Sequence, residues 1–241
     1  RVQPGISKAH VGRMARNMTL KMRISGLPID GAKCGIDYDP NRSGKKAAIS
    51  RFMSAIKPYL LSRYSMGPDL NTDMDELENI ARGLDIPSIK MAIASAQELY
   101  LPYFLERYTI LNQQALGAWT LGRLRAGYGV AAATLATLEY QGIAPNGATA
   151  AIQGFGTLAK SAAIGLIEAG VKIYAIADSE KCYLSHDPAG LDMPTLLAAE
   201  GTLLPEVASS QNFEILNSEA ITSVQSDILV LAAIENAITE D

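Results

Sequence analysis

Residues 148–180, ATAAIQGFGTLAKSAAIGLIEAGVKIYAIADSE, constrain the fold of this chain more than any other stretch. An apolar strand pattern leads into Gly154-Phe155-Gly156-Thr157-Leu158-Ala159, a helical pattern follows, and a second apolar strand ends at Asp178. A strand, a GxGxxA turn, a helix and a strand that ends in an acid, in this order, are typical of the unit that binds dinucleotides. We therefore expect an α/β fold with a Rossmann-like domain in the second half of the chain.

Each residue type in this motif has a physical task in binding a nucleotide. Gly154 permits a tight turn, Gly156 lets a pyrophosphate approach the backbone, and the amino end of the helix attracts the negative charge. Asp178 would accept hydrogen bonds from the adenosine ribose and repel a 2′-phosphate, which favours NAD and leaves NADP possible. We assign three neighbours to the same cofactor site, Phe155, Thr157 and Ser179. The alternative is a glycine-rich turn in an α/β domain that binds no nucleotide.

Charge and cysteine content limit the partners of the chain. It has 21 basic and 25 acidic side chains, and neither sign forms the cluster that marks a nucleic-acid or anionic-membrane surface. No uninterrupted apolar run reaches the roughly 18 residues of a membrane span. Cys34 and Cys182 fit neither a metal-ligand spacing nor a disulfide framework. We expect a cytoplasmic protein that holds no metal and binds a small molecule, not nucleic acid or a membrane.

The length of 241 residues suggests two domains, and we place their boundary near residue 118, between residues 1–117 and 118–241. Apolar spacing predicts helices for 11–25, for 47–64 as one element, and for most of 86–117. It also predicts a turn and a helix with an acidic first turn over 67–84, and a connecting helix and a Pro-Asn-Gly turn over 120–147.

Lys33 stands among small and apolar residues in GLPIDGAKCGI, residues 26–36, where a lysine gains little from packing. A lysine side chain becomes a useful base at neutral pH when burial or a nearby cation lowers its pKa from about 10.4 toward roughly 7 to 8. Lys21, at the end of the preceding helical stretch, would line the same pocket if the chain folds back. One lysine would then hold a carboxylate while the other works on the reacting carbon. The alternative is that both are solvated surface lysines.

Seven stretches together carry a resemblance to a known family. They are MTLK, GLPIDGAKCGIDYDP, GPDLNTDMDELE, AIQGFGTLAKSAA, AIADSE, DPAGLDMPTLL and DILVLAAIENAIT. Their order and approximate spacing resemble those of the glutamate/leucine/phenylalanine/valine dehydrogenase family, over nearly the whole chain. The GLP tripeptide, the GAK loop followed by Asp-Pro, and the loop after the second nucleotide strand are most similar to the glutamate dehydrogenase branch.

The resemblance implies an α/β substrate-binding and oligomerisation domain followed by a Rossmann-like domain. It implies oxidative deamination of an L-amino acid, glutamate-like, to a 2-oxo acid and ammonia with NAD or NADP, in a homo-oligomer. By position, Lys33 and Asp69 would be catalytic, Lys21 would bind the α-carboxylate, and Asn236 would lie near the nicotinamide. The alternative for Asp69 is a turn or helix-cap residue before MDELE.

Departures from the family pattern leave a second function open. Asp30 and Cys34 replace glycines of the lysine loop, and an acid beside Lys33 would hold it in an inactive ion pair. Ala126 stands where the family usually has a threonine. The family's GGxR segment and the part beyond residue 241 are missing, so we expect the chain to be truncated at both ends relative to the family. The alternative is a catalytically weak or inactive homologue that acts as a nucleotide-binding regulatory or structural subunit.

Overall fold

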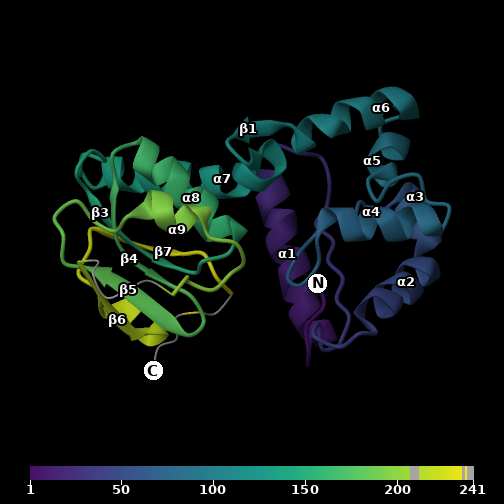
Figure 1. The fold of residues 1–241 in the computed structure, drawn as a ribbon. Helices are drawn as coiled ribbons and strands as arrows, with labels where there is room; N and C mark the ends of the chain where they lie inside the picture. Colours follow the sequence, from purple (N-terminus) through teal and green to yellow (C-terminus); the bar gives the residue numbers. More distant parts are fainter. Residues whose placement is uncertain (207–211, 235–236, 238–241) are drawn as a thin grey trace. The chain divides into compact units, whose positions relative to one another are not determined.

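The computed structural model describes residues 1–206, 212–234 and 237 of the chain (Figure 1). The chain divides into two compact units, Arg1–Tyr108 and Thr109–Asp241. The described residues form an α/β protein, as the sequence predicts: the first unit is built from helices, and the second contains a five-stranded sheet with helices. Among these residues, no helix is both long and apolar enough to cross a membrane.

Six helices form the first unit: α1 (Lys8–Ile24), α2 (Lys45–Ala55), α3 (Lys57–Ser62), α4 (Met74–Gly83), α5 (Met91–Ala96) and α6 (Leu101–Tyr108). Two of them begin at side-chain caps. The Ser7 hydroxyl accepts a hydrogen bond from the His10 N–H at the start of α1, and the Asp73 carboxylate accepts one from the Glu76 N–H at the start of α4. The predicted helix over 11–25 and the predicted acidic first turn of α4 are confirmed.

The prediction of one helix over 47–64 is wrong, because the chain forms α2 and α3 with a break at Ile56. Pro58 explains the break: it has no N–H to continue the hydrogen bonds of α2, and it is well placed in the first turn of a new helix. The helical prediction for 86–117 holds for α5, α6 and the 3-10 turn η1 (Thr109–Asn112). It fails at β1 (Gln114–Leu116), which pairs with β2 (Trp119–Thr120) across Gly117, a residue with φ of +52°.

The core of the first unit collects side chains from several helices and from two extended segments. Ile49, Met53 and Leu60 from α2 and α3 are buried with Leu77 of α4. Val2, which is also fully buried, forms a parallel bridge with Ile36, and this bridge is the only extended pairing within residues 1–108. The segment that carries Lys33 is therefore tied to the core by the first residues of the chain.

The second unit follows the predicted order of strand, glycine turn, helix and strand. Its elements after β2 are α7 (Leu121–Tyr140), β3 (Thr149–Gln153), α8 (Thr157–Glu168), β4 (Lys172–Ala177), β5 (Lys181–Ser185), α9 (Met193–Ala198), β6 (Phe213–Asn217), the 3-10 turn η2 (Ser218–Ser223) and β7 (Ile228–Leu231). The strand order is β6-β5-β4-β3-β7. β3 is parallel to β4 and β7, whereas β5 is antiparallel to both of its neighbours.

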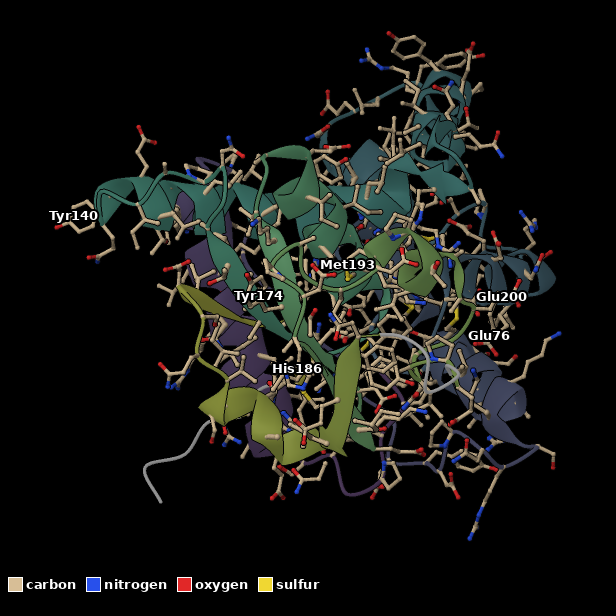
Figure 2. The ribbon with its side chains drawn as sticks, turned by 60° about the vertical axis from the view of Figure 1, so that its left-hand side comes forward. Glu76, Tyr140, Tyr174, His186, Met193 and Glu200 are labelled. Atoms are coloured by element: carbon tan, nitrogen blue, oxygen red, sulfur yellow. The ribbon has the colours of Figure 1, made fainter. Side chains whose placement is uncertain are left out.

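The two faces of this sheet have different coverings. Ala150 and Ile152 belong to an apolar core that includes side chains of α7, α8 and α9, and Figure 1 shows α8 and α9 along the same side of the sheet. Ala151 and Ala175, on the opposite face, pack with Ile221 of η2. At the far end of α7 the ring of Tyr140 is 87% exposed and projects from the molecule (Figure 2). Successive side chains of β3 point to opposite faces, and those of Ala150, Ala151 and Ile152 are all buried, so both faces of this strand are covered. Burial on both faces is expected of a central parallel strand.

Candidate functional site

The lysine loop, residues 26–36, folds back onto α1, as the sequence analysis required for a shared pocket. The Leu27 N–H donates to the Met22 carbonyl (2.9 Å), and the Gly31 N–H donates to Thr19 Oγ1 (3.0 Å). A Cβ atom at Gly31 would overlap the backbone of α1 at Ala15 and Thr19. Glycine at position 31 is therefore needed for the close approach of the loop to the helix.

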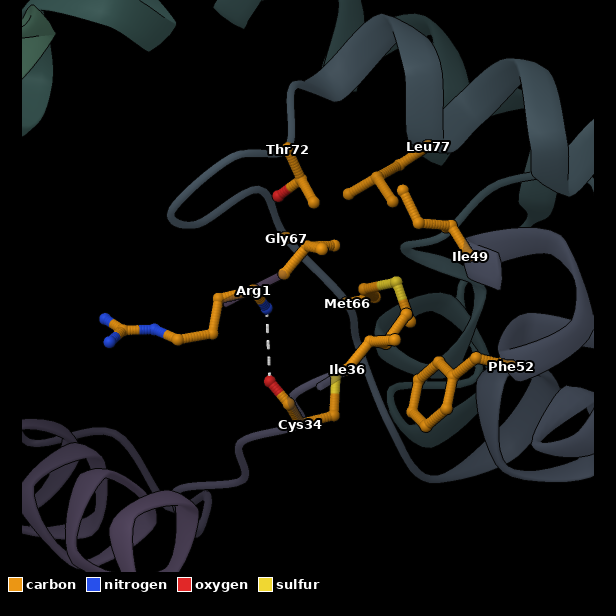
Figure 3. A pocket seen from close by; sticks show the side chains of 10 residues that line it. Arg1, Cys34, Ile36, Ile49, Phe52, Met66, Gly67, Thr72 and Leu77 are labelled. Atoms are coloured by element: carbon orange, nitrogen blue, oxygen red, sulfur yellow. Dashed lines mark hydrogen bonds between the residues drawn. The ribbon is translucent and has the colours of Figure 1, made fainter. Parts of the chain in front are cut away.

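The first three residues of the chain hold the other end of this loop. The Arg1 backbone nitrogen donates to the Cys34 carbonyl at 3.2 Å (Figure 3). The Ile36 N–H donates to the Arg1 carbonyl at 2.9 Å. The same segment binds a second loop, because the Val2 N–H donates to the Leu70 carbonyl (3.1 Å). Residues 1–3 thus lie between the lysine loop and the loop that carries Asp69, and they bring the two loops together.

Asp69 sits in a tight turn that ends just before α4. Its N–H donates to Thr72 Oγ1 and its carbonyl accepts from the Thr72 N–H, both at 2.9 Å. Asn71 adopts φ of +61°, a left-handed conformation that asparagine tolerates, and its side chain donates to the Val2 carbonyl (2.9 Å). The cap of α4 is Asp73, so Asp69 is a turn residue and not a helix cap.

The Lys33 ammonium forms an ion pair with Asp69 Oδ2. The other carboxylate oxygen, Oδ1, accepts from Arg1 Nη2 (3.2 Å) and from the Leu70 N–H (2.7 Å). The three charged side chains are largely enclosed, with 22% of Lys33, 19% of Asp69 and 9% of Arg1 exposed. Two cations face one carboxylate, so the cluster has a net positive charge, which favours anionic groups nearby.

This surrounding lowers the pKa of Asp69. Burial alone raises the pKa of this carboxyl, but the hydrogen bond from Lys33, the Leu70 N–H and the charges of Lys33 and Arg1 outweigh burial and lower it to about 2. Asp69 is therefore ionised at neutral pH. As long as the ion pair is intact, it is a weak proton acceptor.

Two predicted features of the lysine loop are placed differently. Lys21 is exposed on α1, and within the described residues no hydrogen bond or ion pair joins its side chain to the Lys33–Asp69 pair. Asp30 does not pair with Lys33, contrary to expectation: its partner is Arg23 (3.3 Å), and both side chains are mostly exposed. The reason is the return of the loop onto α1, which places Asp30 beside the last turn of that helix, where Arg23 lies.

Sequence reasoning missed Arg1 and Tyr64. Arg1 is far from Asp69 in sequence and belongs to no motif, so only the fold reveals their contact. The Tyr64 hydroxyl donates to the Cys34 sulfur (3.1 Å), and burial, followed by interaction with Cys34, raises the pKa of Tyr64. The sequence signal for the Tyr64–Cys34 contact is Cys34 itself, which stands where the family usually has a glycine.

A small cavity lies beside this cluster, lined by Cys34, Phe52 and Met66 among others (Figure 3). Its volume of about 20 Å³ is enough for one water molecule and too small for an amino acid. In Figure 3 the guanidinium group of Arg1 points away from the apolar side chains of the cavity. The cavity is therefore too small to be a substrate pocket by itself.

In the second unit, the two motif glycines have different surroundings. Gly154 has φ of +114°, and a Cβ there would lie 2.6 Å from the Ala232 carbonyl oxygen, so this position requires glycine. Gly156 precedes α8 and supplies no side-chain cap to it. A Cβ at Gly156 would meet only the Thr202 methyl group, at 4.0 Å. The space in front of the amino end of α8 is open at Gly156.

These features fit the pyrophosphate of a dinucleotide. The first N–H groups of α8 have no side-chain acceptor from the cap residue, and they lie at the end of the helix that favours anions. Next to the turn, Gln153 Oε1 is buried and has no hydrogen-bond partner among the described residues. The uncapped helix end beside an open glycine turn fits an anionic ligand, whereas the unpaired Gln153 oxygen calls for a donor, which a pyrophosphate does not supply.

The remaining residues predicted to bind the cofactor differ in how accessible their side chains are. Phe155 is 1% exposed and belongs to the core, whereas Thr157 and Ser179 are exposed. Asp178 is 8% exposed, and its oxygens already accept three backbone N–H groups: Glu180 (2.7 Å) and Lys181 (2.8 Å) on Oδ1, and Leu204 on Oδ2. Asn236 lies outside the described residues.

Lys160, in the first turns of α8, was not singled out by sequence reasoning. It is 5% exposed, its ammonium lies 4.1 Å from the centre of the Phe155 ring, and it donates to the carbonyls of Ala199 (2.6 Å) and Gly201 (3.0 Å). Burial, and to a smaller extent the charge of Arg123, lowers the pKa of Lys160. The available sequence signal was a lone lysine within a helix made mostly of small and apolar residues.

Comparison with known proteins matches two separate regions of the chain. Residues 1–85 match the model of the Glu/Leu/Phe/Val dehydrogenase dimerisation domain, and residues 120–241 match the Glutamate/Leucine/Phenylalanine/Valine dehydrogenase model. Over 245 residues the chain is 29% identical to the NAD-specific glutamate dehydrogenase of Staphylococcus aureus (strain COL), and over 250 residues it is 27% identical to the NADP-specific glutamate dehydrogenase A1 of Halobacterium salinarum. Both alignments cover the whole chain and 55% of the relative.

Among solved structures, the hetero-hexameric glutamate dehydrogenase from Thermus thermophilus (Leu bound form) superimposes with a TM-score of 0.73 at 23% identity. The superposition covers 99% of this chain and 54% of that one, and it supports the fold. The chain thus spans about half the length of the relatives it matches. Because the two family models together account for most of its residues, the chain belongs to the glutamate/leucine/phenylalanine/valine dehydrogenase family.

Proposed function

We propose that this protein is an NAD(P)-dependent amino-acid dehydrogenase, which oxidatively deaminates an L-amino acid, glutamate-like, to a 2-oxo acid and ammonia. The observation that carries the proposal is the pairing of Lys33 with Asp69, two residues on separate loops that residues 1–3 bring together. The uncapped amino end of α8 behind Gly154 and Gly156 supports a nucleotide site in the second unit.

The reaction needs charge stabilisation and proton transfer at one carbon. A hydride leaves Cα of the amino acid, water adds to the resulting iminium carbon, and the carbinolamine loses ammonia to leave the oxo acid. The nicotinamide, when bound, supplies the hydride acceptor. Lys33 would stabilise the developing oxygen charge and orient the attacking water, and Lys21 would hold the α-carboxylate. Arg1 adds positive charge to the same cluster.

Asp69 would accept the proton of the substrate amine. Its low pKa implies that it does so only after its ion pair with Lys33 opens. While Lys33 is bonded to Asp69, a carboxyl with a pKa of about 2 accepts a proton poorly. A substrate oxygen that draws the Lys33 ammonium away removes the largest stabilising contact of the carboxylate, so its basicity rises. The ion pair thus releases Asp69 for proton transfer only when substrate is present.

NAD is the proposed cofactor, with NADP possible, since the matched relatives include both an NAD-specific and an NADP-specific enzyme by name. Gly154, Gly156 and Thr157 would hold the pyrophosphate at α8, with Ser179 and Asn236 in the roles that the family resemblance implies. We also propose a cytoplasmic homo-oligomer, in which residues 1–117 contain the substrate and assembly surfaces and residues 118–241 the cofactor site.

The closed ion pair also favours the alternative, a catalytically weak homologue that binds nucleotide as a regulatory or structural subunit. If the pair does not open, Asp69 has no proton to exchange. The two functions differ in turnover and agree in nucleotide binding.

The deciding experiment is a spectrophotometric screen of L-amino acids with NAD and with NADP on the purified chain. We expect reduced cofactor with at least one amino acid, loss of the signal in Asp69→Asn, and an unchanged signal in Asp75→Asn, which alters an exposed acid of α4. Nucleotide binding without turnover for every amino acid would favour the non-catalytic homologue. If the chain neither binds a nucleotide nor turns over any amino acid, both proposed functions are overturned.

A further inference from the structure

Residues 199–206, the segment after α9, are attached to the glycine turn and to the end of β4 at several points. Lys160 donates to the carbonyls of Ala199 and Gly201, at 2.6 and 3.0 Å. The Leu204 N–H donates to Asp178 Oδ2, and the Tyr183 hydroxyl donates to the Pro205 carbonyl. The Leu204 side chain is 3% exposed and belongs to the same core as Phe155. Residues 199–206 are therefore held in place next to the glycine turn, residues 154–156.

The attachment points occupy the atoms that a nucleotide would use. Asp178 accepts three backbone N–H groups and is 8% exposed, so little of its carboxylate is accessible to a ribose hydroxyl, although the oxygens keep a free lone pair. A ribose that pushed the segment away would leave the buried Leu204 N–H unpaired, which costs free energy. The three N–H dipoles also offset the carboxylate charge that would otherwise repel a 2′-phosphate.

Lys160 is the counterpart of Asp178 in holding this segment. A buried ammonium needs acceptors for its three donors, and here two carbonyls of the segment and the face of the Phe155 ring provide them. Its removal would free the backbone of Ala199 and Gly201, while the aliphatic part of a methionine would still fill the space. Lys160 thus holds the segment at Ala199 and Gly201, and Asp178 holds it at Leu204.

We propose that Lys160 and Asp178 are positioning residues that hold residues 199–206 against the glycine turn, and that Asp178 for this reason does not select between a 2′-hydroxyl and a 2′-phosphate. The inference rests on the dinucleotide-binding function proposed above. It predicts a site that accepts both forms of the adenosine ribose with similar affinity, in place of the NAD preference that an unoccupied aspartate would produce.

Two measurements on the complete chain test this inference. Hydrogen exchange of the Leu204 amide, whose N–H is bonded to Asp178, reports the attachment without any ligand. Calorimetric titration with adenosine 5′-phosphate and with adenosine 2′,5′-bisphosphate reports selectivity. The variants are Lys160→Met and Asp178→Asn, which places an amide NH2 against at least one backbone N–H. The matched controls are Lys172→Met, whose lysine donates to the Pro188 carbonyl, and Glu180→Gln, an exposed carboxylate near Asp178.

We expect affinities for the two nucleotides within about threefold of each other in the unmodified chain. Lys160→Met and Asp178→Asn should each speed exchange of the Leu204 amide by about tenfold or more, because each lost bond to a buried group opens the segment. They should weaken both nucleotides by the same factor, and the control variants should change neither measurement.

Three results would overturn the inference. A tenfold or larger shift toward the bisphosphate in Asp178→Asn, with exchange unchanged, would make Asp178 the ribose acceptor. Unchanged exchange in Lys160→Met would show that this lysine does not hold the segment. Failure of both nucleotides to bind the unmodified chain would remove the selectivity claim together with the dinucleotide function, and the exchange data would then still decide whether the segment is attached as described.

Discussion

Lys33 and Asp69 meet side chain to side chain, although they lie on different loops, and Arg1 contacts the second oxygen of the same carboxylate at 3.2 Å. The three groups are joined through the backbone of residues 1–3, which binds both loops. The arrangement makes the ionisation of Asp69 depend on the intact fold. That dependence can be measured without substrate or cofactor.

The first prediction concerns stability in acid. The pKa of Asp69 is about 2 in the folded chain and about 3.8 in the unfolded one, so the folded state holds fewer protons between these values. The stabilisation that Asp69 contributes is present above pH about 4 and is lost as the pH falls toward about 2. Asp69→Asn should therefore have a melting temperature that falls less over this window than that of the unmodified protein.

Melting curves by circular dichroism through the window provide the test, and Asp75→Asn is the control because it alters an exposed acid of the neighbouring helix α4. The control should follow the unmodified protein. Parallel curves for Asp69→Asn and the unmodified protein would contradict the ion pair in solution.

A second prediction contrasts two glycines of the same region. Gly31→Ala would force a Cβ into the backbone of α1, so it should destabilise the chain by about 1 to 3 kcal/mol. Gly12→Ala lies within α1 with no atom near its added Cβ, and it should stabilise the helix by about 0.5 to 1 kcal/mol. Urea unfolding of both variants gives the comparison. Equal effects would mean that the lysine loop does not rest on the helix.

The third prediction separates the two motif glycines. Gly154→Ala places a Cβ near the Ala232 carbonyl in a left-handed conformation, so it should lower the melting temperature. Gly156→Ala has room for its Cβ and should leave the melting temperature nearly unchanged, yet it should weaken nucleotide binding by about tenfold or more, since the methyl group lies where a pyrophosphate approaches. Full nucleotide affinity in Gly156→Ala would argue against a phosphate at this turn.

The elements around the glycine turn could be predicted from the sequence because their signals are local. The apolar runs of β3 and β4, the small residues of α8 and the acid at Asp178 follow one another without interruption. The break at Ile56 also has a local signal, which is Pro58. The apolar spacing of residues 47–64 continues through this proline, and it therefore predicts one helix where the chain forms two.

The site could be predicted only in part, because its contacts are not local. Lys33 and Asp69 were assigned through the family resemblance, but nothing in the sequence shows that Arg1 completes their cluster. Asp30 was matched to Lys33 by nearness in sequence, whereas the fold pairs it with Arg23. Leu204 reaches Asp178 from a loop far along the chain, and no pattern of residues announces such a bond.

The corrected position of Asp30 leads to a fourth prediction. Its partner Arg23 is on the surface, and exposed ion pairs of this kind contribute little to the stability of a fold. Asp30→Gly, which restores the residue usual in the family, should change turnover by less than about twofold. Steady-state rates with the best amino acid of the screen provide the measurement. A large gain in turnover would show that Asp30 restrains Lys33 after all.

The central claim is that Lys33 acts on the reacting carbon while Lys21 only holds the substrate. The most direct test is the steady-state comparison of Lys33→Ala and Lys21→Ala with the unmodified chain. Loss of a positioned acid–base group should lower kcat of Lys33→Ala by about 10² to 10⁴. Loss of a charged hydrogen bond to a spectator carboxylate should instead raise KM of Lys21→Ala by about tenfold or more with little change in kcat. Unchanged kcat in Lys33→Ala would contradict the account.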